Sequence, residues 1–97
     1  MRQYFLIQYD QTGNAELREE KRGMHIAFRK ALGNALALAG PLLDDDGTPE
    51  GSVIILAAAD KAEAERIAAS DPFVEAGLLE LRSVQMMRIA AMIPPCS

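Results

Sequence analysis

The centre of the chain reads DDDGTPEGSVIILA, residues 44–57, and this stretch decides how the remaining elements can be arranged. Its first half is a cluster of turn-forming residues of the kind that joins two antiparallel strands. Its second half, residues 52–57, is apolar on both faces and predicts a central strand of a sheet. The segment before the turn, residues 36–43, fits either the partner strand or the end of a preceding helix.

The N-terminal half adds one strand and one helix. Residues 4–9 are rich in aromatic and β-branched side chains, and residues 10–14 are turn formers, which predicts a first strand followed by a loop. From about Ala15 the spacing becomes helical, and Gly40-Pro41 closes the run. The apolar positions that share one helical face are Leu17, Met24, Phe28, Ala31 and Ala35.

The C-terminal half repeats this alternation. Asp60 with Glu63 forms a capping pattern that begins a second helix, whose buried stripe we expect at Ala64, Ile67 and Ala68. Asp71-Pro72 starts a further short turn or helix that ends at Gly77. Residues 78–89 predict a last strand, with a bulge where the pattern slips at Arg82-Ser83.

The resulting order, β-α-β-β-α-β, predicts an α+β protein of the ferredoxin-like class, with an antiparallel sheet and both helices on one face. We expect a single domain over residues 1–97, of which about 90–97 form a tail. The other face of the sheet has no cover within one chain. A second copy of the same sheet is the simplest cover, so we expect a homodimer.

Composition excludes several classes of function. The 97 residues are 49% hydrophobic and 25% charged, as in an ordinary globular domain. The net charge of -4, with no basic run, argues against a nucleic-acid partner. The longest uncharged apolar stretch, residues 53–59, is too short to cross a bilayer, and the N-terminus lacks the pattern of a signal peptide, so we expect a cytoplasmic protein.

Few residues are available for metal, cofactor or thiol chemistry. The one cysteine, Cys96, is penultimate and follows two prolines, and the chain has one histidine. A structural zinc site therefore lacks ligands. Since no glycine-rich phosphate loop follows a strand, we predict no nucleotide cofactor and no metal.

The candidate for proton transfer is His25, at the edge of the apolar stripe of the first helix, because imidazole transfers protons near neutral pH. The alternative is a boundary histidine bonded to a backbone carbonyl. Asp71 can orient the ring or merely cap a helical turn. Ser52 can hold a substrate oxygen or finish a turn, and Arg22 and Arg29 can steer an anion or remain solvated. The three aspartates at 44–46 fit no calcium loop and are typical of a solvated hairpin tip.

Several of these motifs, taken together, resemble the YCII-related family. They are Arg22-x-x-His25, Ala39-Gly40-Pro41, Gly51-Ser52, Asp71-Pro72-Phe73 and Ala76-Gly77-Leu78, and their order matches from Tyr4 to about Val84. The resemblance implies a ferredoxin-like subunit of the dimeric α/β barrel superfamily, which includes muconolactone isomerases. It also implies a His-Asp active site, as is proposed for a family member that dehydrochlorinates a chlorinated hydroxyhydroquinone.

Carried onto this chain, the family site falls on His25 and on Asp71 as the best acidic match, with Asp46 as a weaker one. The ending, residues 86–97, departs from the short aromatic or basic ending of the family. Methionines in this part, Met86, Met87 and Met92, fit a core or a dimer interface.

Two functions follow as hypotheses. The first is a small cofactor-free enzyme of lyase or isomerase type, in which His25 and Asp71 perform acid-base catalysis on a small oxygenated substrate, aromatic ones included. In it Arg22 and Ser52 bind the substrate. The second is a non-catalytic dimeric metabolite-binding or accessory module that uses the same pocket.

Overall fold

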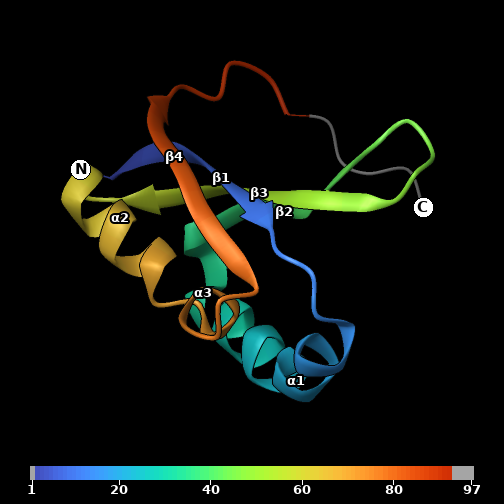
Figure 1. The fold of residues 1–97 in the computed structure, drawn as a ribbon. Coiled ribbons are helices and arrows are strands. Elements are labelled where there is room, and N and C mark those ends of the chain that lie inside the picture. Colours follow the sequence, from blue (N-terminus) through green and yellow to red (C-terminus); the bar gives the residue numbers. More distant parts are fainter. Residues whose placement is uncertain (1, 93–97) are drawn as a thin grey trace.

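The computed structural model describes residues 2–92. Figure 1 shows the elements in chain order. They are β1 (Gln3–Gln11), α1 (Ala15–Leu32), the 3-10 turn η1 (Gly33–Ala35), β2 (Leu36–Leu43), β3 (Pro49–Ala58), α2 (Lys61–Ala69), α3 (Pro72–Glu75) and β4 (Leu79–Met87).

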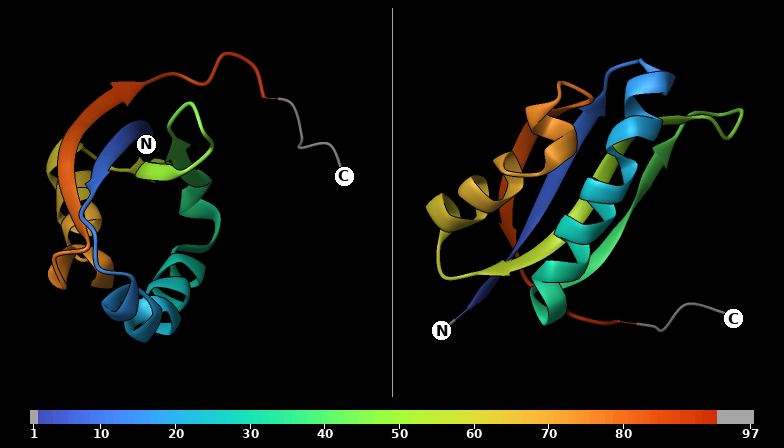
Figure 2. Two further views of the ribbon diagram at one scale, coloured as in Figure 1. Left: turned by 45° about the vertical axis from the view of Figure 1, so that its right-hand side comes forward. Right: turned by 90° about the horizontal axis from the view of Figure 1, so that it is seen from below.

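The four strands form one antiparallel sheet in the order β2-β3-β1-β4, so β1 and β3 are central. The helices all lie on one face of this sheet (Figure 2). The predicted ferredoxin-like α+β fold is therefore confirmed. The segment that the sequence left open, Leu36–Leu43, is a strand, and it pairs with β3 through the predicted polar turn.

The core lies between the sheet and the C-terminal helices. Phe5, Ile7 and Tyr9 alternate along β1 and point to the helix-covered face, where all three are buried. Ala64 and Ala68 bring α2 close to the sheet, as the expected stripe predicts. Such small residues let a helix approach a sheet closely, so the large side chains of the strands fill the space between the layers.

Helix α1 differs from the prediction in its length and in its buried face. Asn14 begins it by accepting a hydrogen bond from the Leu17 backbone N–H, and Gly33 ends it with a positive φ of 56°. The helix does not reach Gly40, because the residues after Gly33 enter strand β2. Met24 was expected in the apolar stripe, but it is 57% exposed, and no residue of α1 is fully buried.

In the C-terminal half, the helix caps and the strand bulge lie at the residues that the sequence predicted. Asp60 caps α2 by accepting from the Glu63 backbone N–H at 2.8 Å. Asp71 caps α3, whose first residue is a proline, and Gly77 follows with a φ of 79°. The pairing of β4 with β1 shifts register between Gln8 and Tyr9, which leaves Arg82 as the bulge.

The C-terminal end was predicted to hold packed methionines and a tail. Met86 and Met92 are exposed in the single chain and so do not form part of its core. Residues 93–97, which include Cys96 and most of the predicted tail, lie outside the described residues. Among residues 2–92, every helix is too short or too polar to cross a bilayer.

Candidate active site

Asp71 is a buried carboxylate between α2 and α3. Its side chain is 1% exposed, and its Oδ1 atom accepts a hydrogen bond from the Phe73 backbone N–H at 2.9 Å. The same Oδ1 lies 2.8 Å from Nδ1 of His25. Because Pro72 starts α3 directly after it, the cap geometry fixes the direction in which this carboxylate points.

His25 reaches Asp71 from the middle of α1. Its ring is 15% exposed and stacks on Phe73, with the two centroids 4.0 Å apart and the planes 3° from parallel. The hydrogen bond and the stacked ring together restrict both rotation and tilt of the imidazole. Since a carboxylate oxygen can only accept, Nδ1 carries the proton and Nε2 is left as the acceptor of the neutral ring.

Arg29 lies one helical turn after His25 and connects Asp71 to the sheet. Its Nε atom is 4.0 Å from Asp71 Oδ2, and its Nη2 donates to Ser52 Oγ at 3.4 Å. Ser52, a buried residue near the start of β3, in turn donates to the Gly40 carbonyl at 3.4 Å. The predicted site residues His25, Asp71 and Ser52 therefore lie in one chain of contacts through Arg29.

Arg18 adds a second guanidinium, two turns before His25. Its Nη2 donates to the Leu78 carbonyl at 3.2 Å, and its guanidinium carbon lies 5.0 Å from the centre of the Phe73 ring. The face of an aromatic ring attracts a cation at this distance. Phe73 thus contacts both Arg18 and His25.

A cavity of about 160 Å³ opens between α1 and the ends of β2 and β3. Arg18, His25 and Arg29 line it from the helix, and Ser52 lines it from the sheet. The rest of the wall is Gln11, Gly40, Pro41, Gly51, Phe73 and Leu79. A polar helix face thus meets a partly apolar wall, an arrangement typical of sites for small molecules.

Tyr9 lies in the core close to these groups. Its hydroxyl is buried and donates to the Ala68 carbonyl at 3.2 Å. Burial raises the pKa of Tyr9 well above its usual range, the nearby Asp71 carboxylate raises it further, and Arg29 acts in the opposite direction. The phenol therefore stays protonated, and it adds no negative charge next to the Asp71 carboxylate.

Two of the sequence candidates lie elsewhere. Arg22 is further round α1, its side chain is 65% exposed, and it pairs with Glu19 at 3.8 Å. It does not line the cavity. Asp46, the weaker acidic match, is exposed at the hairpin tip, where its backbone N–H donates to Asp44. The solvated tip predicted for the three aspartates fits this geometry.

Sequence reasoning missed Arg18 and Phe73. Arg18 precedes His25 by seven residues, a spacing that returns to the same helical face, so the signal was present in the periodicity. The stack of Phe73 on His25 depends on how α1 packs beside α3, and no local pattern indicates it. Within residues 2–92, no group of three or more His, Cys, Asp or Glu side chains is arranged to hold a metal ion.

The fold is α+β, and a histidine-carboxylate pair lies beside its cavity. The model of the YCII-related domain matches residues 1–88, and the chain belongs to that family. No curated protein matches it significantly. Among solved structures it is similar to 5-chloro-2-hydroxyhydroquinone dehydrochlorinase from Burkholderia phenoliruptrix in complex with 2,5-dihydroxybenzoquinone. The identity is 26%, the TM-score is 0.65, and the match covers 92% of this chain and 93% of the other.

Proposed function

We propose that this chain is a small cofactor-free enzyme of lyase or isomerase type, in which His25 moves a proton on a small oxygenated substrate. One observation carries the proposal: the 2.8 Å contact between His25 Nδ1 and Asp71 Oδ1 at the wall of the cavity. A family relationship and the similarity to a dehydrochlorinase support it.

The geometry suits His25 to act first as a base. Asp71 holds the proton on Nδ1, so the lone pair of Nε2 is available to a substrate proton. When Nε2 accepts a proton, the ring becomes positive, and the adjacent carboxylate stabilises that charge. Asp71 is then a positioning residue, because it acts on the reaction through His25.

The proton can leave His25 in two ways that correspond to the two reaction types. In an isomerisation, the imidazolium returns the proton taken from a substrate hydroxyl to a carbon atom of the same molecule. In an elimination of hydrogen halide, the halide departs with its bonding electrons while His25 carries the proton away. General acid-base catalysis of this kind contributes about 10²- to 10⁴-fold to a rate.

The remaining wall residues bind and orient the substrate in this proposal. Arg29 and Ser52, which contact each other at 3.4 Å, together hold polar groups of the substrate at this part of the wall. The binding role predicted for Arg22 passes to Arg29 and Arg18, since these two line the cavity and Arg22 is exposed outside it.

A substrate screen tests the proposal. Purified protein is incubated with hydroxylated one-ring compounds, including 5-chloro-2-hydroxyhydroquinone, and proton transfer and halide release are followed. We expect turnover in the wild type, and losses of about 10²-fold or more in His25→Ala and in Asp71→Asn. Asp60→Asn is the matched control, because Asp60 is an exposed helix cap that does not line the cavity.

Three results decide the outcome. An active wild type whose turnover survives both His25→Ala and Asp71→Asn contradicts the proposal. Binding of a metabolite without any turnover favours the non-catalytic module. Loss of turnover in Asp60→Asn as well as in Asp71→Asn means that the loss reflects general damage and not the site.

The proposal includes a homodimer that covers the outer face of the sheet. Leu6, Val53 and Ile55 are only partly buried there, and Leu38 and Leu42 are exposed. The hollow on this face, about 1000 Å³, is lined mostly by apolar side chains and lies away from His25. Apolar surface of this kind is typical of an interface. Sedimentation should give the mass of two chains, and the mass of one chain contradicts this part.

A further inference from the structure

We infer that the cavity beside His25 selects a small oxyanion with a single ring, meaning a carboxylate, phenolate or enolate, and that Arg29 holds its charge. The inference rests on the proposed function and names the substrate class of the same site. Three observations support it: the charge of the wall, the state of the Arg29 side chain, and the size of the cavity.

The wall of the cavity is positive although the chain is acidic. Arg18 and Arg29 both line it, and the one carboxylate next to them is Asp71, which lies 4.0 Å from Arg29, so two guanidinium charges face one negative charge. The chain as a whole carries a net charge of -4. A local potential of opposite sign to the net charge indicates an attraction for anions that the composition alone would not provide.

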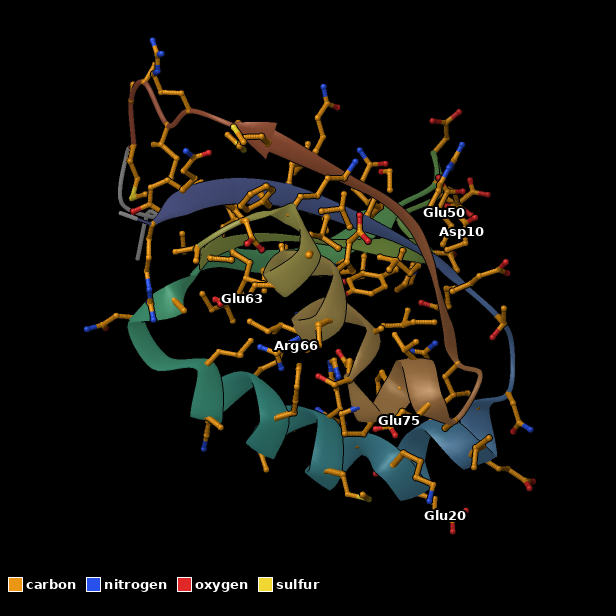
Figure 3. All side chains as sticks on the ribbon, turned by 90° about the vertical axis from the view of Figure 1, so that its left-hand side faces the viewer. Asp10, Glu20, Glu50, Glu63, Arg66 and Glu75 are labelled. Atoms are coloured by element: carbon orange, nitrogen blue, oxygen red, sulfur yellow. The ribbon has the colours of Figure 1, made fainter. Side chains whose placement is uncertain are left out.

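Three other carboxylates, Asp10, Glu20 and Glu50, do not cancel this charge. Glu20 points away from the fold on the outer side of α1, and Asp10 and Glu50 lie together at one end of the sheet (Figure 3). Asp10 is already paired, since Arg82 Nη1 lies 3.3 Å from its Oδ1. These carboxylates are exposed, so solvent and salt screen their effect on the cavity.

The Arg29 side chain is held in place, but its N–H donors are not all used in short hydrogen bonds. Its side chain is only 19% exposed, so its charge has lost much of its water. Within residues 2–92, its polar side-chain contacts are Ser52 at 3.4 Å and Asp71 at 4.0 Å, both beyond the usual 2.7–3.2 Å of N–H···O hydrogen bonds. A guanidinium has five N–H donors, and its planar fork matches a carboxylate or similar oxyanion. An anion in the cavity would complete these bonds.

The size and lining of the cavity define the rest of the ligand. An enclosed cavity of about 150 Å³ holds benzene, so the roughly 160 Å³ of this half-open cavity gives room for one six-membered ring. Pro41, Phe73 and Leu79 supply apolar surface for the body of such a ring. The ligand is therefore an apolar ring with an anionic oxygen group directed at Arg29.

Calorimetric titration with a matched pair of compounds tests the inference. The probes are 4-hydroxybenzoate, a carboxylate, and 4-hydroxybenzamide, its neutral analogue of the same shape. A third probe, 2,5-dihydroxybenzoquinone, is an enolate-type anion at neutral pH and distinguishes that class from carboxylates. We expect the wild type to bind at least one of the anions about 10-fold or more tightly than the neutral amide, as expected for a charge-assisted bond.

Two variants locate the effect. Arg29→Gln should weaken binding of the anion about 10- to 100-fold and change binding of the amide by less than about 3-fold. Lys30→Gln removes one positive charge from the next, exposed position of α1, and it should change anion binding by less than about 2-fold. Circular dichroism checks that each variant is folded, and Arg18→Gln provides a second test at the same wall if Arg29→Gln unfolds.

Each outcome of the titration decides the inference. An affinity for the amide that equals the affinity for the tighter-binding anion overturns it, as does absence of binding of both anions to the wild type. Equal losses in Arg29→Gln and Lys30→Gln also overturn it, because they would show a diffuse charge effect. The titration measures no turnover, so Arg29-dependent anion binding upholds the inference even if no reaction is found. Turnover of neutral rings without anion binding would uphold the proposed function alone.

Discussion

Replacing Asp71 by asparagine isolates the charge of the buried carboxylate. Asparagine has the same shape and is as good a helix cap, so the bond to the Phe73 backbone N–H should survive. What changes is the bond from His25 at 2.8 Å and the ion pair with Arg29 at 4.0 Å. The variant therefore tests electrostatics at the site with little change in packing.

The size of the effect follows from these two contacts. A hydrogen bond to a charged group contributes about 1.5–3 kcal/mol and a neutral one about 1 kcal/mol, so the His25 bond should weaken by about 0.5–2 kcal/mol. The longer, partly solvated pair with Arg29 adds about 0–1 kcal/mol. We expect Asp71→Asn to lower the free energy of unfolding by about 0.5–3 kcal/mol, or the melting temperature by about 2–24 °C.

Urea unfolding followed by circular dichroism measures this difference. Asp60→Asn makes the same chemical change at an exposed cap and should stay within about 0.5 kcal/mol of the wild type. Asp71→Ala should cost about 1 kcal/mol more than Asp71→Asn, because it also removes the cap of α3. A loss for Asp71→Asn no larger than that for Asp60→Asn would refute the assigned role of the carboxylate in the fold.

Three further predictions concern the surroundings of the site. The pKa of Tyr9 is raised in the folded chain, so above pH about 10 only the unfolded chain loses the phenol proton. The free energy of unfolding should therefore be unaffected by this group below pH about 10 and should fall above it by up to about 1.4 kcal/mol per pH unit. Tyr9→Phe should remove this slope in urea unfolding at pH 9 to 11, and an unchanged slope contradicts the assignment. A Cβ atom at Gly51 would lie 2.6 Å from the Tyr9 carbonyl oxygen, so Gly51→Ala should cost about 1–3 kcal/mol. Gly23→Ala has open space in a helix and should stabilise by about 0.5–1 kcal/mol, and similar values for the two glycine variants would be inconsistent with the close approach. Phe73→Leu removes the stacked ring, so the His25 ring protons should lose an upfield ring-current shift in the NMR spectrum.

The sequence was sufficient for the order of elements because the signals are local. The polar turn before β3, the Asp60 cap and the bulge at Arg82 each depend on a few neighbouring residues. The end of α1 and part of its buried face were not predictable in this way, although Leu17 and Ala35 of the expected stripe do pack against the core. Its stripe was assigned from apolar residues such as Met24, but the side that faces the sheet carries arginines and the histidine, because it forms the wall of the cavity.

In the candidate site too, local motifs were predictable and contacts that depend on packing were not. The His25 and Asp71 positions followed from a lone imidazole, a cap motif and a family resemblance, and the structure brings the two side chains into contact. The sequence alone could not decide whether Arg22 or Arg18 lines the cavity, because both lie near His25 on a helical projection. Only the packing of α1 decides which of the two reaches the cavity.

The tautomer of His25 tests the central claim most directly. The chain has a single histidine, so a long-range ¹H–¹⁵N NMR spectrum reports its ring without overlap. We predict that the neutral ring carries its proton on Nδ1 in the wild type, with Nε2 free to accept, and that Asp71→Asn abolishes this preference. A wild-type ring protonated on Nε2 would contradict the claim that Asp71 prepares His25 to receive a proton from a molecule in the cavity.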